Sequence, residues 1–198
     1  MRGKCRALVG TLPRSVRHPT GNEPTSQLTN TSAFGVGSVI RRCHFRNTRS
    51  GANAQLSNTI IEDCTFERAV HGCGLMVGNH SSIEGIPPYH ITFRRNRVVD
   101  SWGGMRTLRV GNRNGGAATL HGLVFEDNEV VNPVIALWVS DASDVLFRNN
   151  RFTGSTEKNA FGENGCQFIV SNSEDVRSEG NLLNGRPVEF GCGGIRTE

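Results

Sequence analysis

Short apolar strands recur along this chain, and each one runs into a polar turn built on Cys or Asn and then into a second strand. Residues 91–99, with the sequence Ile-Thr-Phe-Arg-Arg-Asn-Arg-Val-Val, are one example. The six turn residues, here called the anchors, are Cys43, Cys64, Asn96, Asn128, Asn150 and Asn181, at spacings of 21, 32, 32, 22 and 31 residues. A unit of about 21 residues, sometimes enlarged by a loop of about ten, predicts a solenoid and is too short for pairs of helices.

Residues at fixed distances from the anchors share their chemical character. Three positions before the anchor the residues are Ile40, Ile61, Phe93, Phe125 and Phe147, with Ser178 as the exception. Two positions after it they are Phe45, Phe66, Val98, Val130, Phe152 and Leu183. Because apolar residues alternate with polar ones around each turn, both columns are expected to point inward from short strands.

A third strand is expected in each unit, with apolar residues inward and varied residues outward. The segments that fit this pattern are 75–77, 108–110, 137–139, 168–170 and 188–190. Their central, outward residues are Met76, Arg109, Trp138, Ile169 and Glu189. The solenoid is therefore predicted to have three faces, of which the third carries the most diverse chemistry.

Three strands per unit and an Asn column at one corner resemble the right-handed parallel β-helix family, which includes pectate-lyase-like and polygalacturonase-like proteins. The resemblance covers about residues 34–195. It implies an all-β, single-stranded right-handed parallel β-helix of about six coils of three short strands, with an Asn/Cys ladder at one corner. The four Asn anchors match the ladder of that family, whereas Cys43 and Cys64 depart from it. Residues 1–33 are predicted to be a poorly structured or capping segment, and residues 34–198 the β-helix domain.

Charge and hydropathy argue against several classes of partner. The net charge is +4, and no polybasic block indicates nucleic-acid binding. No apolar stretch is long enough to span a membrane. The apolar run from Ala7 to Val9 is too short for the core of a signal peptide, so an extracellular or cell-surface location is implied by the family resemblance alone.

The two ends of the β-helix and its cysteines raise separate expectations. No amphipathic helix follows the last coil, and an uncapped coil exposes strand edges and core. The chain is therefore expected either to be a fragment of a longer β-helix or to have its ends covered by another chain. Alternatively, residues 1–33 fold over the first coil. Cys43 and Cys64 occupy one column in successive coils, and free buried thiols are favoured over a disulfide between them.

The outward face of the third strands is the candidate functional surface. Segments 79–89, 111–121 and 155–165 flank it and are expected to wall a groove suited to a linear polymer. The resemblance implies a polysaccharide in that groove. The candidate substrate-binding residues are Trp138, Gln167, Tyr89 and Lys158. The candidate catalytic residues are His71, Arg106, Arg109, His121 and Glu189.

The chemistry available to these residues leaves binding, elimination and hydrolysis open. The ring of Trp138 can stack on the C–H face of a sugar, and Arg106 or Arg109 can pair with a uronate carboxylate. A lyase needs a base, for which His71, His121, Tyr89 and Lys158 are candidates. A hydrolase needs two carboxylates, and Asp100, Glu163 and Glu189 are the nearest. None of these residues lies in a recognised catalytic signature.

A second hypothesis is a non-catalytic structural or interaction β-helix, such as part of an adhesin, spike or fibre. An outward column of the first strands is apolar, which predicts assembly, for example as a homo-oligomer, through Val39, Ile60, Thr92, Val124 and Leu146. On this hypothesis Trp138 is an exposed strand aromatic, and Arg97, Glu129 and Arg151 form an outer salt-bridge ladder. No cofactor is expected. Asp141 and Asp144 could ligate Ca²⁺, but such pairs are more often turn formers.

Overall fold

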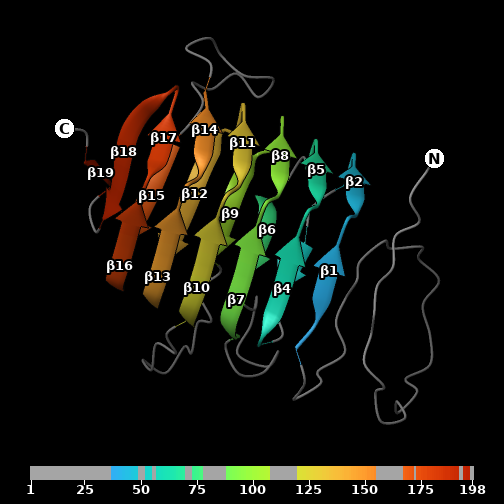
Figure 1. The fold of residues 1–198 in the computed structure, drawn as a ribbon, viewed down its shortest axis with the longest axis horizontal. Coiled ribbons are helices and arrows are strands. Elements are labelled where there is room, and N and C mark those ends of the chain that lie inside the picture. Colours follow the sequence, from blue (N-terminus) through green and yellow to red (C-terminus); the bar gives the residue numbers. More distant parts are fainter. Residues whose placement is uncertain are drawn as a thin grey trace, which may run out of the picture.

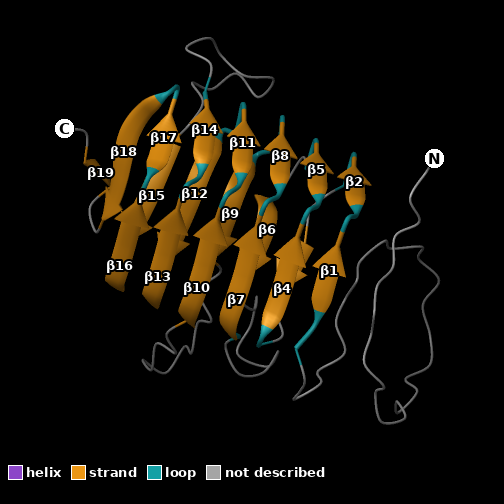
Figure 2. Ribbon diagram, viewed as in Figure 1, coloured by secondary structure: helices purple, strands orange, loops and turns teal. Residues whose placement is uncertain are grey.

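The computed structural model describes residues 37–48, 52–54, 57–69, 73–77, 88–107, 120–154, 167–171, 173–191 and 194–196. These residues form a parallel β-helix, in which the strands of each coil lie directly beside the equivalent strands of the next (Figure 1). The described residues contain strands, turns and bends and no helix, as Figure 2 shows. The expected N-terminal segment, residues 1–33, lies outside the described residues.

Three parallel sheets, called A, B and C, build the solenoid. The coils are numbered 1 to 6 in chain order, and each begins at a strand of sheet A. Sheet A contains β1 (Val39–Arg41), β4 (Thr59–Glu62), β7 (Tyr89–Arg94), β10 (Leu120–Glu126), β13 (Ala142–Arg148) and β16 (Glu174–Glu179). Sheet B contains β2 (His44–Arg46), β5 (Thr65–Glu67), β8 (Arg97–Val99), β11 (Glu129–Val131), β14 (Arg151–Thr153) and β17 (Asn181–Leu183). Sheet C contains β3 (Ala52–Ala54), β6 (Cys73–Val77), β9 (Gly103–Thr107), β12 (Ile135–Ser140) and β15 (Gln167–Ser171).

The inward columns predicted from the sequence form the core. The largest fully buried side chains include Phe66, Phe93, Phe125, Phe147 and Phe152. Rings of one column contact each other from coil to coil; for example, the centroids of Phe93 and Phe125 lie 5.2 Å apart in a stacked arrangement. Burying one such side chain contributes about 1.5–3 kcal/mol, so this aromatic column is a main source of contact energy between coils.

The Asn ladder at the corner between sheets A and B is confirmed. Asn96, Asn128, Asn150 and Asn181 are at most 2% exposed. The backbone N–H of Asn96 donates to Oδ1 of Asn128 (2.9 Å), and Nδ2 of Asn128 donates to the carbonyl oxygen of Phe93 (2.9 Å). Cys64 joins the ladder through its backbone N–H, which donates to Oδ1 of Asn96 (2.9 Å). Each amide therefore satisfies backbone groups that the corner would otherwise leave unpaired in the interior.

Left-handed backbone conformations recur at equivalent positions in successive coils. One column precedes the anchors and contains Arg42, Asp63, Arg95, Asp127, Asn149 and Gly180, all with φ between 51° and 62°. A second column lies inside the sheet A strands and includes His90, Gly122 and Asp144. Asn, Asp and Gly tolerate this conformation best, which explains their frequency at the bends. At Gly122 a Cβ atom would lie 2.5 Å from Cδ2 of His90, so glycine is needed there for space as well.

The predicted third strands need two corrections. In coil 3 the third strand is β9, earlier than expected, and its register places Met105 beside Leu75 and Leu137; residues 108–110 lie outside the described residues. β18 (Arg186–Gly191) is not a parallel third strand, because it pairs antiparallel with β17. The hairpin turn consists of Asn184 and Gly185, both with positive φ. β18 then pairs antiparallel with β19 (Gly194–Arg196).

β18 also corrects the expectation of an open core after the last coil. In Figure 1 it bends back across the end of the solenoid beside β16 and β17. Its Phe190 is 3% exposed and its ring stacks on that of Phe168 with centroids 4.9 Å apart. The Phe190 backbone N–H donates to Oγ of Ser178 (3.0 Å). An antiparallel strand thus covers the core at this end.

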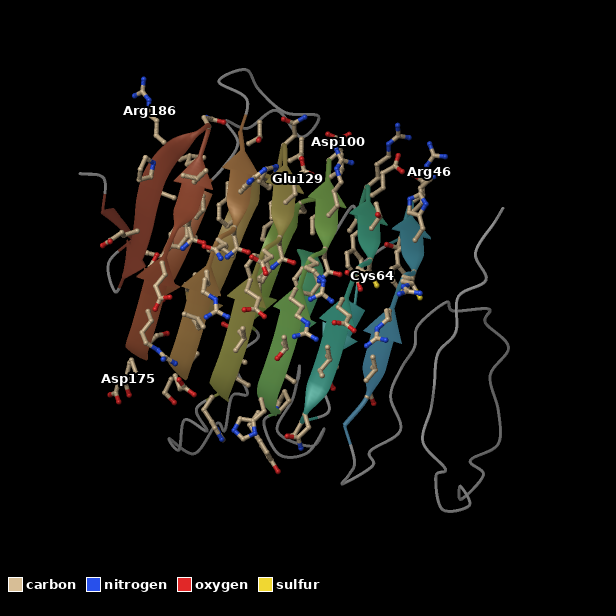
Figure 3. All side chains as sticks on the ribbon, in the orientation of Figure 1. Arg46, Cys64, Asp100, Glu129, Asp175 and Arg186 are labelled. Atoms are coloured by element: carbon tan, nitrogen blue, oxygen red, sulfur yellow. The ribbon has the colours of Figure 1, made fainter. Side chains whose placement is uncertain are left out.

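The two cysteines of the ladder differ in state. Cys64 is a free, buried thiol at the bend between β4 and β5 (Figure 3), and burial raises its pKa. Cys43 is disulfide-bonded, so the expectation of a free thiol is wrong there. The two do not pair with each other, as expected; instead the backbone N–H of Cys43 donates to Sγ of Cys64 (3.4 Å).

Candidate functional site

Sheet C presents a cluster of two tryptophans and an arginine on its outward face. Trp138 lies on β12, and the strand register places Arg106 of β9 directly beside it. Trp102 precedes β9 and is held by its backbone: its N–H donates to the carbonyl oxygen of Ala69 (3.0 Å), and its own carbonyl accepts from Ile135 (2.9 Å). All three cluster side chains are partly exposed.

The guanidinium of Arg106 lies against both indole rings. Its Cζ is 4.5 Å from the ring centroid of Trp138 and 5.5 Å from that of Trp102. The two indoles are 6.2 Å apart and inclined by 36°. Cation–π contacts of this kind contribute about 0.5–2 kcal/mol each, depending on how far the cation is desolvated. They hold the guanidinium in one place on the sheet surface.

Arg106 has hydrogen-bonding capacity left over in this position. Its Nε atom is buried and has no hydrogen-bond partner among the described residues. No ion pair joins its guanidinium to the described part of the chain. A guanidinium offers five N–H donors in a planar fork that matches a carboxylate or phosphate. The cluster is therefore suited to an anion that brings a flat apolar surface with it.

Buried side chains on the inward side of β9 and β12 support the cluster from below. On the inward side of the same strands Met105 is 1% exposed and Leu137 is fully buried. Beyond them, Oγ1 of Thr107 donates to the carbonyl oxygen of Ser140 (3.0 Å) and accepts from the Ser140 N–H (2.8 Å). A Cβ at Gly104 would lie 2.5 Å from the carbonyl oxygen of Ala136, so β9 and β12 approach closely at this point.

Tyr89 and His121, two of the predicted site residues, meet at a different place. They are paired in register at the start of β7 and β10 in sheet A, and their rings stack 5.2 Å apart at an angle of 5°. The ring of His90 stands edge-on to both, and its Nδ1 lies 3.3 Å from Oδ1 of Asn58. Tyr89, His90 and His121 are exposed.

Glu189 occupies a third place. It lies on β18 and lines, with Asp175 and Phe190, a shallow hollow of about 260 Å³ between β16 and β18. Figure 3 shows Asp175 projecting from the start of β16 at the end of the solenoid. The predicted catalytic residues that can be located therefore do not form one catalytic centre. Among the described residues, no three His, Cys, Asp or Glu side chains gather as a metal site.

Several predicted residues lie outside the described residues. They are His71, Arg109 and Lys158, together with most of the three segments that were expected to wall a groove. Gln167 is placed only through its backbone, which pairs with Ile135. Trp102 was missed, because it belongs to no strand. The sequence feature that could have indicated Trp102 is its position just before Gly103 and Gly104, in the turn that leads into β9.

The outward face of sheet A carries a second organised surface. The column two positions before the anchors, here called the charge column, alternates in sign from coil to coil. Its members, paired in register, are Arg41, Glu62, Arg94, Glu126, Arg148 and Glu179. Next to it lies the apolar column Val39, Ile60, Thr92, Val124 and Leu146, which continues at Arg177. The apolar column that was predicted from the sequence is therefore aligned as expected.

Glu62 is the centre of the charge column. Its side chain is 1% exposed and pairs with Arg41, with Arg94 (2.8 Å) and with Arg95 (2.7 Å). Burial of the carboxylate raises its pKa, but the hydrogen bonds from the arginines outweigh burial and lower the pKa to about 2. Arg95 also bonds Asp63 (2.8 Å), and both carboxylates raise the pKa of its guanidinium. Glu126 is a second carboxylate of this column that is paired with an arginine of a neighbouring coil, Arg148.

The remaining charged pairs are structural. Of the predicted outer ladder, Arg97 and Glu129 form an ion pair at 2.7 Å. Asp144, considered above as a calcium ligand, pairs instead with Arg177 at 2.6 Å. Exposed pairs of this kind contribute about 0–1 kcal/mol each.

One comparison with known proteins identifies the fold family. A family model described as a right-handed β-helix region matches residues 27–195, which is most of the chain. Neither the curated proteins nor the solved structures contain a match. In the described part of the chain, no helix has the length and apolar character needed to cross a membrane.

Proposed function

We propose that this chain, which belongs to the right-handed β-helix family, binds a carboxylate-bearing polysaccharide across sheet C. Trp102 and Trp138 stack on the sugar rings, and Arg106 pairs with a carboxylate. The observation that carries the proposal is the position of Arg106, whose guanidinium lies against both indoles with a buried Nε that has no partner among the described residues.

The two kinds of contact suit one ligand. The C–H face of a pyranose is flat and apolar, as an indole ring requires, and stacking removes both from water. A uronate carboxylate next to that face can accept two parallel hydrogen bonds from the fork of Arg106. A neutral glycan offers the first contact without the second. The proposal therefore predicts a preference for acidic over neutral polymers.

The proposal is binding, and cleavage is not part of it. Acid–base catalysis needs a proton donor or acceptor within about 2.6–3.2 Å of the reacting group. In the described part of the chain no carboxylate, imidazole or phenol forms a hydrogen bond or ion pair with Arg106. Tyr89 and His121 lie together on sheet A, and Glu189 lies on β18.

An extracellular or cell-surface location accompanies this proposal. Polymeric uronates are found outside cells, and the disulfide at Cys43 favours an oxidising compartment.

Tryptophan fluorescence gives a direct test, because the chain contains only two tryptophans and both belong to the cluster. Titration with a polyuronate is expected to change the emission, and the same polymer with its carboxyls methyl-esterified is expected to bind at least about tenfold more weakly. Arg106→Gln should abolish this difference, and Trp138→Phe should weaken both. Leu146→Ala, on the outward face of sheet A, is the matched control. Equal affinity for both polymers, or none, contradicts the proposal.

A second candidate function is that of a structural or interaction β-helix without a saccharide ligand. The apolar column on sheet A favours it, because Val39, Ile60, Val124 and Leu146 are only partly buried. It predicts that the protein self-associates and that Ile60→Asp disperses the assembly. Light scattering over a range of concentrations measures this, and a monomer at every concentration would remove its support.

A further inference from the structure

We infer that two copies of this chain pair through the outward faces of sheet A, about a two-fold axis that runs along the strands. The two solenoids are then antiparallel, because the order of the coils is reversed in the second copy. The inference concerns a face other than sheet C and holds whether or not the chain binds saccharide. It rests on the charge column, on the apolar column beside it, and on how each behaves under two-fold symmetry.

Each inner residue of the charge column has an oppositely charged neighbour in both adjacent coils, whereas the first and last described members have such a neighbour in one adjacent coil only. Glu62 lies between arginines of coils 1 and 3, because it contacts both Arg41 and Arg94. Arg41 is the first member of the column among the described residues, which supply a carboxylate on one side of it only, and its side chain is 51% exposed. Glu179 ends the column, is exposed, and forms no ion pair with the described residues. Coil 1 therefore presents an unbalanced positive charge and coil 6 an unbalanced negative one.

Antiparallel pairing balances both ends. A two-fold axis along the strands places coil 1 against coil 6 of the second copy, coil 2 against coil 5, and coil 3 against coil 4. Because the six charge-column residues alternate in sign, each lies opposite a residue of the other sign. Glu62 and Glu126 are already paired with arginines of their own chain, so the pairs that dimerisation adds are those between Arg41 and Glu179. Arg41 faces Glu179 of the second copy at both ends of the interface. Oppositely charged surfaces of this kind fix orientation and suppress other arrangements.

The same operation brings the apolar column onto itself. The axis passes between coils 3 and 4, so Thr92 of one copy faces Val124 of the other, and Ile60 faces Leu146. At the two ends Val39 faces Arg177, whose guanidinium is paired with Asp144 of its own chain. An axis along the solenoid would instead place each coil against the same coil of the second copy, so that Glu179 would lie near Glu174, which carries the same charge, and would stay unbalanced. The antiparallel arrangement alone buries the apolar column and pairs the charges together.

End-to-end stacking would also bring coil 6 against coil 1, but β18 opposes it. A following coil needs the free edge of β17, and β18 already occupies that edge as its antiparallel partner. Phe190 of β18 covers the core behind it. The complementary charges at the two ends of the column therefore lead to a closed pair and not to an open filament.

The size of the face sets the strength of the pair. Six strands of three to seven residues, at about 3.3 Å per residue and about 4.8 Å between strands, give a face of roughly 500 Å², or about 1,000 Å² for two copies. This is the lower limit for stable interfaces, so a dissociation constant in the micromolar range is expected.

Sedimentation velocity over a range of concentrations, at low and high salt, tests the inference on the full chain. The wild type should pass from monomer to dimer, and added salt should weaken the dimer. Glu179→Arg and Arg41→Glu should each raise the dissociation constant about tenfold or more, because like charges then meet twice. Mixed together, the two variants should form a heterodimer, because each then supplies the charge that the other lacks.

Two further variants complete the test. Val124→Asp, at the centre of the face, should abolish the dimer. Arg186→Glu should leave it unchanged, because Arg186 projects from the start of β18, away from sheet A (Figure 3). The inference is overturned by a monomer at all concentrations, by assemblies that grow beyond two copies, by a dimer insensitive to Glu179→Arg, or by failure of the mixed variants to associate.

Discussion

Replacing Glu62 by Gln should destabilise the β-helix at neutral pH and much less in acid. Three arginines surround this buried carboxylate, and its pKa falls from 4.5 to about 2. At about 1.4 kcal/mol per pKa unit, this shift corresponds to about 3 kcal/mol at most. The arginines are 34–51% exposed, so water screens part of the attraction. We therefore expect a loss of about 1–2 kcal/mol at pH 7.

The pH dependence follows from the sign of the shift. Because the pKa in the folded state lies below that in the unfolded state, the stabilisation is complete above about pH 4.5 and is lost as the pH falls toward about 2. The free energies of wild type and Glu62→Gln should therefore converge progressively as the pH falls from about 4.5 toward about 2. Urea denaturation followed by circular dichroism at several pH values measures this difference.

An exposed pair provides the control for Glu62. Arg97 and Glu129 form an ion pair at 2.7 Å, but both side chains are about half exposed. Glu129→Gln should therefore cost less than about 0.5 kcal/mol at pH 7. If Glu62→Gln costs no more than Glu129→Gln, or if its cost does not change with pH, the reasoning about the buried carboxylate is refuted.

Three further changes test the ladder, the bends and the core. Asn128→Ala removes an acceptor for the Asn96 N–H and a donor to the Phe93 carbonyl, and should cost about 2–4 kcal/mol by urea denaturation. Gly122→Ala should lower the thermal midpoint by several degrees, since it strains a left-handed residue and crowds His90; a neutral effect would contradict the described backbone. Phe125→Ala should cost about 3–5 kcal/mol, and a loss below about 1 kcal/mol would mean that the aromatic column is not packed as described.

The fold could be predicted because its strongest signals are local and repeated. The Asn anchors and the apolar columns lie at fixed offsets within each unit, so no knowledge of long-range contacts was needed to align them. The charge column two positions before the anchors could have been found by the same alignment, since Arg94 and Glu126 stand at equivalent places.

The errors arose where the repeat is interrupted. Residues 108–110, Leu-Arg-Val, fit the sequence pattern of a third strand, but the described third strand of coil 3 lies earlier and begins with two glycines, which carry no apolar signal. The hairpin after β17 did have a signal, because Asn184-Gly185 is the dipeptide typical of a tight hairpin turn. Val188 and Phe190 also satisfy the alternation of a parallel strand, so periodicity alone does not distinguish the two arrangements.

The candidate site was predicted in part. Trp138 and Arg106 were both expected on the third face, and strand pairing places them together. That Arg106 is the residue paired with Trp138 depends on where β9 begins within the long segment between β8 and β10, which periodicity does not determine. Trp102 enters the cluster from a turn, so only the folded chain brings it near Trp138.

Alternation of charge along sheet A imposes a parity rule on the length of the solenoid. Removing coil 4 alone, residues 120–141, would bring Arg94 beside Arg148, two like charges in contact. Removing coils 3 and 4 together, residues 89–141, would bring Glu62 beside Arg148 and preserve the sequence of signs. Shortened or lengthened versions of this protein should therefore tolerate coils deleted or duplicated in twos far better than singly, although every junction keeps the same hydrogen-bonding corner.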